Sequence, residues 1–314
     1  MMEVPVYLIT GFLESGKTTF IKDVLSSPDF ADGQKTLILL CEEGEEDYDE
    51  KELGRHNIEV ISVENEEDLT PDFMEQCQKY YKPYRVFVEF NGMWNARKFA
   101  EEKLFRRWQI AQVITLVDGS TFDVYLNNMR SILTNIFSLT ELVIFNRCTL
   151  SMDLFRYRRS VKGVNPQVMI SFEDDKGNQL ELGREQPPYD LNADIIDIDD
   201  VDWGLWFLDV NDNPERYEGK TVRFTGKVMI PRKFGEDLFI PGRNAMTCCA
   251  EDIRFIGYIC RSKHTAKLKP RMWLEVTAQI RYEYMKEYNG EGPVLYARHL
   301  KSVDAPKDEL VYFN

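Results

Sequence analysis

The chain has 314 residues, of which 43% are hydrophobic and 12% aromatic, so its composition is that of a globular protein and not of a disordered one. Lysine and arginine number 39 against 53 aspartate and glutamate, and the net charge of -14 disfavours general binding to nucleic acid or to anionic membranes. A chain of this length predicts two domains.

The N-terminal segment and the cysteine pattern together predict a cytoplasmic protein. Residues 1–10 lack a basic segment followed by a long apolar run, and no later segment approaches the roughly 20 apolar residues that span a bilayer. The 6 cysteines are too few and too scattered for a disulfide framework. The 3 histidines form no close pair, which disfavours a multi-histidine zinc centre. We therefore expect no membrane partner.

The first half of the chain alternates strand-like and helix-like patterns. Strands are expected, in chain order, at Val4–Thr10, Thr36–Leu40, Ile58–Val63, Arg85–Phe90, Val113–Val117 and Leu142–Phe145. The intervening segments are long enough for crossover helices, the first of them at Lys17–Leu25. Several of the runs are continuously apolar, as strands buried on both faces are. The pattern predicts an α/β domain with a mostly parallel sheet.

The second half has an all-β pattern. The composition becomes polar and then acidic from about residue 171, so we expect a first domain over 1–185, an acidic linker over 186–202 and a second domain over 203–314. Five short strands in the last segment predict a small β-barrel, for which an OB-like fold is a reasonable choice. These strands are expected at Thr221–Ile230, Leu238–Ile240, Ile253–Cys260, Met272–Tyr282 and Val294–His299. Trp203 and Trp206 are expected to pack at the start of this domain.

Residues 11–18, with the sequence GFLESGKT, fit the phosphate-loop pattern G-x-x-x-x-G-K-[ST]. The motif lies between a predicted strand and a predicted helix, as a phosphate loop requires. Backbone N–H groups and the helix N-terminus would bind phosphates, Lys17 would reach the terminal phosphates, and Thr18 would offer its hydroxyl to Mg²⁺. The predicted nucleotide-binding residues of this loop are Gly11, Phe12, Leu13, Glu14, Ser15, Gly16, Lys17, Thr18 and Thr19.

Further polar residues follow other predicted strands. Glu89 ends a strand, so its carboxylate is expected at the carboxyl edge of the sheet, where it would bind Mg²⁺ and act with Lys17 in catalysis. A plain surface role for Glu89 is the alternative. Asn146 and Arg147 follow a later strand, where a loop that recognises the base is expected.

The segment Glu42–Glu52 is strongly acidic. Eight carboxylates with a single lysine favour a solvated, mobile loop. The alternative is a switch segment that closes on Mg²⁺ or on a delivered cation, and Glu42 is then the preferred ligand.

With these motifs, residues 1–170 resemble the CobW, UreG and HypB class of metallochaperone GTPases. ITGFLESGKTTF is similar to the family's GFLGSGKTT, Cys41 to Glu45 to N-E-F-G-E, and Glu89-x-x-Gly92 to E-x-x-G. Asp118 resembles a strand-terminal Asp of the family, Asn146-Arg147 the start of its N-K-x-D, and Asn165-Pro166 its N-P. The resemblance implies hydrolysis of GTP or ATP with Mg²⁺, coupled to delivery of a transition metal to a client metalloprotein.

Three features depart from the family pattern. Residues 60–73, before the E-x-x-G segment, contain no cysteine where the family has C-x-C-C. Thr149 stands for the Asp that would bind guanine, which leaves the choice between GTP and ATP open. The usual CobW C-terminal domain, with its histidine-rich loop, is replaced.

Residues 247–252, TCCAED, resemble a segment of the OB-like domain of YcgQ-type proteins. As thiolates, Cys248 and Cys249 could bind Zn²⁺ or Cu(I), with Cys260 and His264 completing the ligand set. A buried, inert cysteine pair is the alternative. The basic run from Arg261 to Arg271 is more typical of a solvated loop than of a nucleic-acid contact.

Taken together, the residues predict a P-loop nucleotide-binding protein that hydrolyses GTP and acts in metal homeostasis or as a metallochaperone. One alternative is a nucleotide-gated protein-binding module with little hydrolysis. Another is single-stranded nucleic-acid binding through the barrel.

Overall fold

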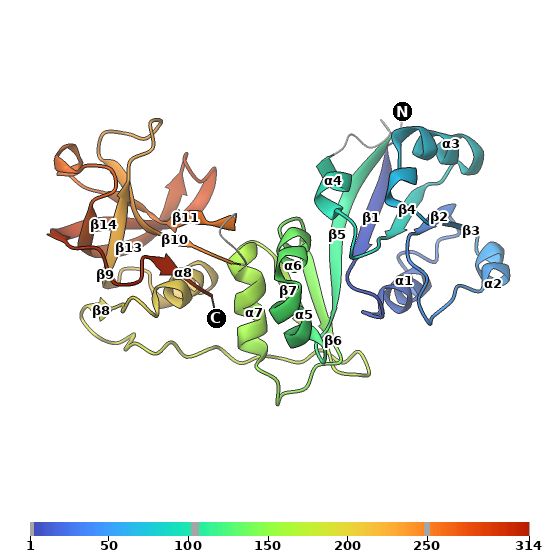
Figure 1. The fold of residues 1–314 in the computed structure, drawn as a ribbon, viewed down its shortest axis with the longest axis horizontal. Helices are drawn as coiled ribbons and strands as arrows, with labels where there is room; N and C mark the ends of the chain where they lie inside the picture. Colours follow the sequence, from blue (N-terminus) through green and yellow to red (C-terminus); the bar gives the residue numbers. More distant parts are fainter. Residues whose placement is uncertain (1–2, 102–106, 248–251, 314) are drawn as a thin grey trace. The chain divides into compact units, whose positions relative to one another are not determined.

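The computed structural model describes residues 3–101, 107–247 and 252–313 (Figure 1). The chain divides into two compact units. Unit 1 consists of Met1–Leu154 and Gln167–Leu182, and unit 2 of Phe155–Pro166 and Gly183–Asn314. Within the described ranges, no helix combines the length and the apolar character needed to cross a membrane.

Unit 1 is built on a seven-stranded sheet with the strand order β3-β2-β4-β1-β5-β6-β7, and every neighbouring pair is parallel. The strands are β1 (Val4–Thr10), β2 (Thr36–Leu40), β3 (Ile58–Ser62), β4 (Arg85–Glu89), β5 (Trp108–Asp118), β6 (Leu142–Asn146) and β7 (Met169–Phe172). The predicted α/β fold with a mostly parallel sheet is confirmed. The sequence did not predict β7, because this strand has four residues and only Phe172 is buried.

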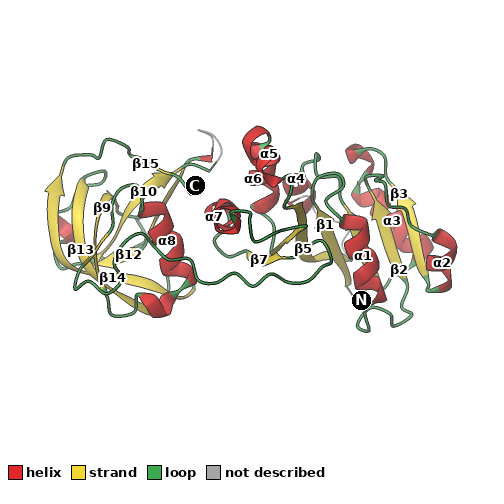
Figure 2. Cartoon of the chain, turned by 90° about the horizontal axis from the view of Figure 1, so that it is seen from below, coloured by secondary structure: helices red, strands yellow, loops and turns green. Residues whose placement is uncertain are grey.

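Helices cover both faces of this sheet (Figure 2). They are α1 (Lys17–Ser26), α2 (Glu50–Arg55), α3 (Pro71–Tyr81), α4 (Ala96–Glu101), α5 (Phe122–Asn128) and α6 (Arg130–Phe137), whereas α7 (Leu154–Val164) belongs to unit 2 from Phe155 on. Successive side chains of a strand point to opposite faces of the sheet and pack into two different hydrophobic clusters. Phe87 packs with Ile21 of α1, whereas Val86 and Val88 pack with Met74 of α3. Burial on both faces explains the continuously apolar strands.

Unit 2 contains a closed barrel. Strands β9 (Thr221–Met229), β10 (Leu238–Ala245), β12 (Ile259–Arg261), β14 (Gly290–Val303) and β13 (Trp273–Met285) pair in that order, and β13 pairs with β9 to close the ring. The predicted small β-barrel is confirmed. The shorter strands β8 (Ile196–Asp197), β11 (Arg254–Gly257) and β15 (Leu310–Val311) add to its edges.

One end of the predicted acidic linker, residues 186–202, contributes to this barrel. β8 pairs with β9, and Ile196 and Ile198 are buried in the barrel's hydrophobic core. This burial is possible because isoleucines alternate with aspartates in the segment. Each isoleucine side chain can point into the core while the neighbouring aspartates remain in water. The domain boundary itself stays a prediction.

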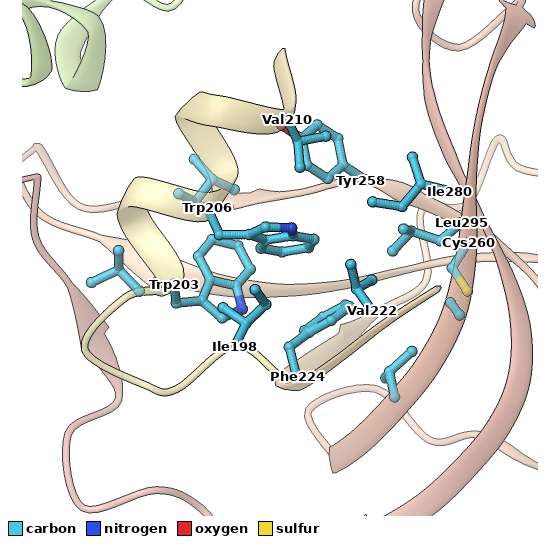
Figure 3. Close-up of a cluster of buried hydrophobic side chains, with 14 of the residues drawn as sticks. Ile198, Trp203, Trp206, Val210, Val222, Phe224, Tyr258, Cys260, Ile280 and Leu295 are labelled. Atoms are coloured by element: carbon cyan, nitrogen blue, oxygen red, sulfur yellow. The ribbon is translucent and has the colours of Figure 1, made fainter. Parts of the chain in front are cut away.

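Helix α8 (Trp203–Asp212) packs its buried side chains into the hydrophobic core of the barrel. Trp203 and Trp206 are 0% and 1% exposed and lie among core side chains that include Val222 and Phe224 (Figure 3). The expectation that both tryptophans pack at the start of this domain is therefore met. In the same unit, Arg158 and Lys162 form ion pairs with Asp212 of α8, at 2.9 and 3.2 Å.

Candidate nucleotide-binding site

The carboxyl ends of the parallel strands of unit 1 meet at one edge of the sheet, and the phosphate loop connects β1 to α1 at this edge. Gly11 has φ +140°, and a Cβ atom there would lie 2.2 Å from the carbonyl oxygen of Leu116. Gly16, at the start of α1, has φ +92°. Both positions therefore require glycine, which is the physical reason for the spacing of the motif.

Lys17 lies inside the loop and is 4% exposed. Its Nζ donates hydrogen bonds to the carbonyl oxygens of Gly11 and Phe12, at 3.0 and 2.9 Å. It also forms an ion pair with Glu42 Oε2, at 2.7 Å. The predicted switch residue Glu42 thus neutralises the lysine that is expected to bind phosphate. A nucleotide must displace this carboxylate to reach Lys17.

Thr18 and Glu89 come together as expected of a magnesium site. Thr18 Oγ1 donates to Glu89 Oε1 at 2.6 Å, and Tyr48 donates its hydroxyl to Glu89 Oε2, also at 2.6 Å. Burial raises the pKa of Glu89, although the hydrogen bonds from Thr18 and Tyr48 act in the opposite direction. A hydroxyl beside a buried carboxylate is an oxygen-donor pair that fits Mg²⁺.

Asn146 and Arg147 hold the phosphate loop from the end of β6. Asn146 Nδ2 donates to the carbonyl oxygen of Ser15 at 2.8 Å. Arg147 Nη1 donates to the carbonyl oxygen of Glu14 at 2.9 Å and to Asp118 Oδ2 at 2.6 Å. Burial raises the pKa of Asp118, but hydrogen bonds from Ser120 and Arg147 outweigh it, so that the pKa lies below its usual value. The two residues therefore hold the backbone of the phosphate loop directly.

The other predicted loop residues divide into buried and exposed positions. Phe12 is buried and stacks on Tyr125 with 4.2 Å between the ring centroids, whereas Leu13 and Thr19 are exposed. Ser15 Oγ is buried and has no hydrogen-bond partner among the described residues. A phosphate oxygen would give this hydroxyl the partner that it lacks.

The acidic segment lies against the phosphate loop. Besides the Lys17 ion pair, Glu46 pairs with Lys22 of α1 at 3.0 Å, and the backbone N–H of Glu45 donates to Glu14 Oε1 at 2.8 Å. Glu14 has φ +61°, and the similar family motif has glycine here. Its carboxylate thus connects the loop to the acidic segment, a contact that glycine could not make.

The space between the acidic segment and the phosphate loop is small. A cavity of about 40 Å³, lined by residues that include Lys17, Thr18, Glu42 and Glu89, has room for only a few water molecules. A phosphate group that binds Lys17 would take the position that the Glu42 carboxylate now holds.

We expect Glu42→Gln to tighten the binding of Mg²⁺·GTP by about five- to ten-fold. The carboxylate competes with the phosphates for Lys17, and the neutral amide competes less. The dissociation constant is measured by calorimetric titration, with the exposed neighbour Glu43→Gln as the control for lost negative charge. Equal or weaker binding by the Glu42 variant would count against this competition.

The predicted transition-metal ligands are only partly within the described residues. Cys248 and Cys249 lie outside them. Cys260 is 0% exposed and points into the hydrophobic core of the barrel (Figure 3), where burial raises the pKa of its thiol. A thiol held protonated in an apolar core does not suit a metal ligand. In the parts of the chain that the structure describes, no group of three or more His, Cys, Asp or Glu side chains is arranged to bind a metal ion.

Two residues of the site were not singled out from the sequence. Tyr48 donates to Glu89 from a position 41 residues away, and no motif indicates this contact. Asp118 was noted only as a family landmark, although its place at the end of β5 could have identified it as an edge residue.

A phosphate loop before a helix at the carboxyl edge of a parallel sheet, with a buried lysine and a threonine–carboxylate pair, defines the class of P-loop nucleotide-binding proteins. Residues 5–171 match the model of the CobW/HypB/UreG nucleotide-binding domain, so the chain belongs to this family. Residues 175–313 match the DUF1980 C-terminal domain.

The zinc chaperone YjiA of Escherichia coli (strain K12) is 27% identical over 143 residues, which are 40% of this chain and 44% of YjiA. The match thus spans less than half the length of that curated relative. Among solved structures, Zn(II)-bound YjiA GTPase from E. coli has 22% identity and a TM-score of 0.42, covering 54% of this chain and 57% of that one. The hydrogenase maturation factor HypB from Archaeoglobus fulgidus has 19% identity and a TM-score of 0.43, covering 56% and 84%.

Proposed function

We propose that this protein binds and hydrolyses GTP with Mg²⁺ and acts in transition-metal homeostasis as a metallochaperone for a client metalloprotein. The observation that carries the proposal is the 2.6 Å hydrogen bond from Thr18 Oγ1 to Glu89 Oε1, next to Lys17 in the phosphate loop. Membership of the CobW/HypB/UreG family supports nucleotide binding. Similarity to a protein named as a zinc chaperone supports the metal role.

Each residue has a defined task in this proposal. Lys17 turns from Glu42 to the terminal phosphates and stabilises the charge of the transferred phosphoryl group. Thr18 and Glu89 hold Mg²⁺, which when bound neutralises charge on the β- and γ-phosphate oxygens. Asn146 and Arg147 keep the phosphate loop in shape beside the base.

Zn²⁺ is the transition metal that we propose, and Cys248 and Cys249 are its proposed ligands. Thiolates are ligands that Zn²⁺ accepts readily. Cys260 is left out of this set because its side chain is buried in the barrel core. Glu42, once released from Lys17, is a further carboxylate that a cation could use.

The test measures Zn²⁺ binding and phosphate release in the same samples, with Mg²⁺ and either GTP or ATP. Wild type should bind Zn²⁺ and hydrolyse GTP faster than ATP. The Cys248→Ser/Cys249→Ser variant should lose Zn²⁺ binding, whereas Cys260→Ala should keep it. Wild-type Zn²⁺ binding by the double variant would overturn the metal part of the proposal.

A nucleotide-gated binding module with little hydrolysis is the second candidate. The Lys17–Glu42 ion pair favours it, because this contact must break when phosphates bind, and the acidic segment then becomes free for a partner. Nucleotide binding without phosphate release in the same samples, even with Zn²⁺ present, would support this candidate over the GTPase.

A further inference from the structure

The loop after β6 lacks the carboxylate that would recognise guanine. The chain continues from Asn146 and Arg147 through Cys148 to Thr149, whose hydroxyl pairs with that of Ser151 at 2.8 Å. A threonine hydroxyl cannot provide the two negatively charged acceptor atoms of a carboxylate. If the site prefers GTP, another residue must supply them.

The neighbouring strand ends beside this loop and is followed by Glu173. The backbone N–H of Cys148 donates to the carbonyl oxygen of Glu173 at 2.8 Å, and the N–H of Glu173 donates to the carbonyl oxygen of Phe145 at 2.7 Å. These bonds continue the pairing of β6 with β7 past the end of the strands. Glu173 is therefore fixed next to the loop in which Thr149 replaces the carboxylate.

The Glu173 side chain is partly buried. In the part of the chain that the structure describes, no side chain donates a hydrogen bond to its carboxylate. Burial raises the pKa of Glu173, and the charges of Asp174 and Asp23 raise it further. Asp174 differs, since its carboxylate accepts from the backbone N–H groups of Lys176 and Asn178, both at 2.8 Å.

The hydrogen bond from the Cys148 N–H to the Glu173 carbonyl oxygen fixes Glu173 at the carboxyl edge of the sheet, beside the loop that follows β6. The first residues of that loop, Asn146 and Arg147, donate to carbonyl oxygens of the phosphate loop. Glu173 therefore lies at the same edge of the sheet as the phosphate loop.

We propose that Glu173 recognises the guanine base and takes the role of the carboxylate that is absent at Thr149. An ionised carboxylate presents two acceptor oxygens, and guanine presents adjacent donors at N1 and at the 2-amino group, so two hydrogen bonds form. Adenine presents one donor, the 6-amino group, next to the acceptor N1. This assignment rests on the proposed GTP-binding function and names the residue that sets its base preference.

The test compares the affinities of the full chain for GTP, ATP and xanthosine triphosphate, each with Mg²⁺, in wild type and in Glu173→Gln. We expect GTP affinity to fall about ten- to a hundred-fold in the variant. Affinity for xanthosine triphosphate should rise, because the amide accepts from N1–H and donates to the 2-oxo group of xanthine. Asp175→Asn, an exposed neighbour with the same change of charge, should leave all three affinities unchanged.

A second variant tests the same role by rescue. Thr149→Asp in the Glu173→Gln background restores a carboxylate in the loop after β6 and should restore the preference for GTP. Unchanged GTP and xanthosine triphosphate affinities in Glu173→Gln, or a wild-type preference for ATP, would overturn the assignment. Failure of wild type to bind any of the three nucleotides would instead overturn the proposed function.

Discussion

Lys17→Ala is expected to lower the rate of phosphate release from GTP by at least about 100-fold. Lys17 is buried in the phosphate loop, where its charge is held close to the position of the terminal phosphates. Water screens a buried charge poorly, so its interaction with a phosphate is strong. The rate is measured as inorganic phosphate released by the full chain with Mg²⁺·GTP.

Lys22→Ala is the matched control for this variant. Lys22 lies on the same helix, but its ion pair with Glu46 is at the surface, with side-chain exposures of 34% and 65%. Surface ion pairs contribute little to stability, so the control should fold and hydrolyse GTP almost as wild type does. Wild-type rates in Lys17→Ala, or equal losses in both variants, would contradict the assignment of Lys17.

Trp206→Ala should destabilise the barrel of unit 2 by about 3–5 kcal/mol. The side chain is 1% exposed and packs against Phe224 and Tyr258, with ring centroids 4.7 and 5.8 Å away. Truncation would leave a large cavity in the centre of the hydrophobic core. The free energy of unfolding is measured by urea denaturation, followed by circular dichroism.

The Trp206→Phe variant keeps an aromatic ring in the core but lacks the indole N–H. Comparing it with Trp206→Ala therefore separates the effect of lost packing from the effect of the lost N–H group. Nε1 of Trp206 is buried without a hydrogen-bond partner among the described residues, so phenylalanine removes a donor that contributes no bond. We expect this variant to lose much less stability than Trp206→Ala. Equal losses in the two variants, or a loss below about 1 kcal/mol in Trp206→Ala, would contradict the central place of this ring in the core.

The strands of unit 1 could be predicted because burial on both faces leaves continuous apolar runs in the sequence. The bounds expected for β1 and β2 agree with the structure. Helix α8 was not predicted, because its residues are apolar almost all round and give no helical periodicity. Its Gly204 is explained only by the fold, since a Cβ there would lie 2.5 Å from the carbonyl oxygen of Tyr312.

The phosphate loop could be predicted because its chemistry requires fixed residues at a fixed spacing. The strand position of Glu89 was sufficient to predict its approach to Thr18. The contacts of Glu14 and Tyr48 could not be predicted, because each joins segments that are distant in sequence and meet only through loops. For Cys260 the sequence spacing indicates a metal ligand. Its position on strand β12 instead directs the side chain into the hydrophobic core of the barrel.

Calorimetric titration of the wild-type chain with GTP, once with Mg²⁺ and once with EDTA, tests most directly whether the phosphate loop and Glu89 form a Mg²⁺-dependent GTP site. We predict saturable binding of a single GTP per chain with Mg²⁺, and clearly weaker binding with EDTA because Thr18 and Glu89 then lack their cation. Absence of saturable GTP binding in the presence of Mg²⁺ would contradict the assignment of this site.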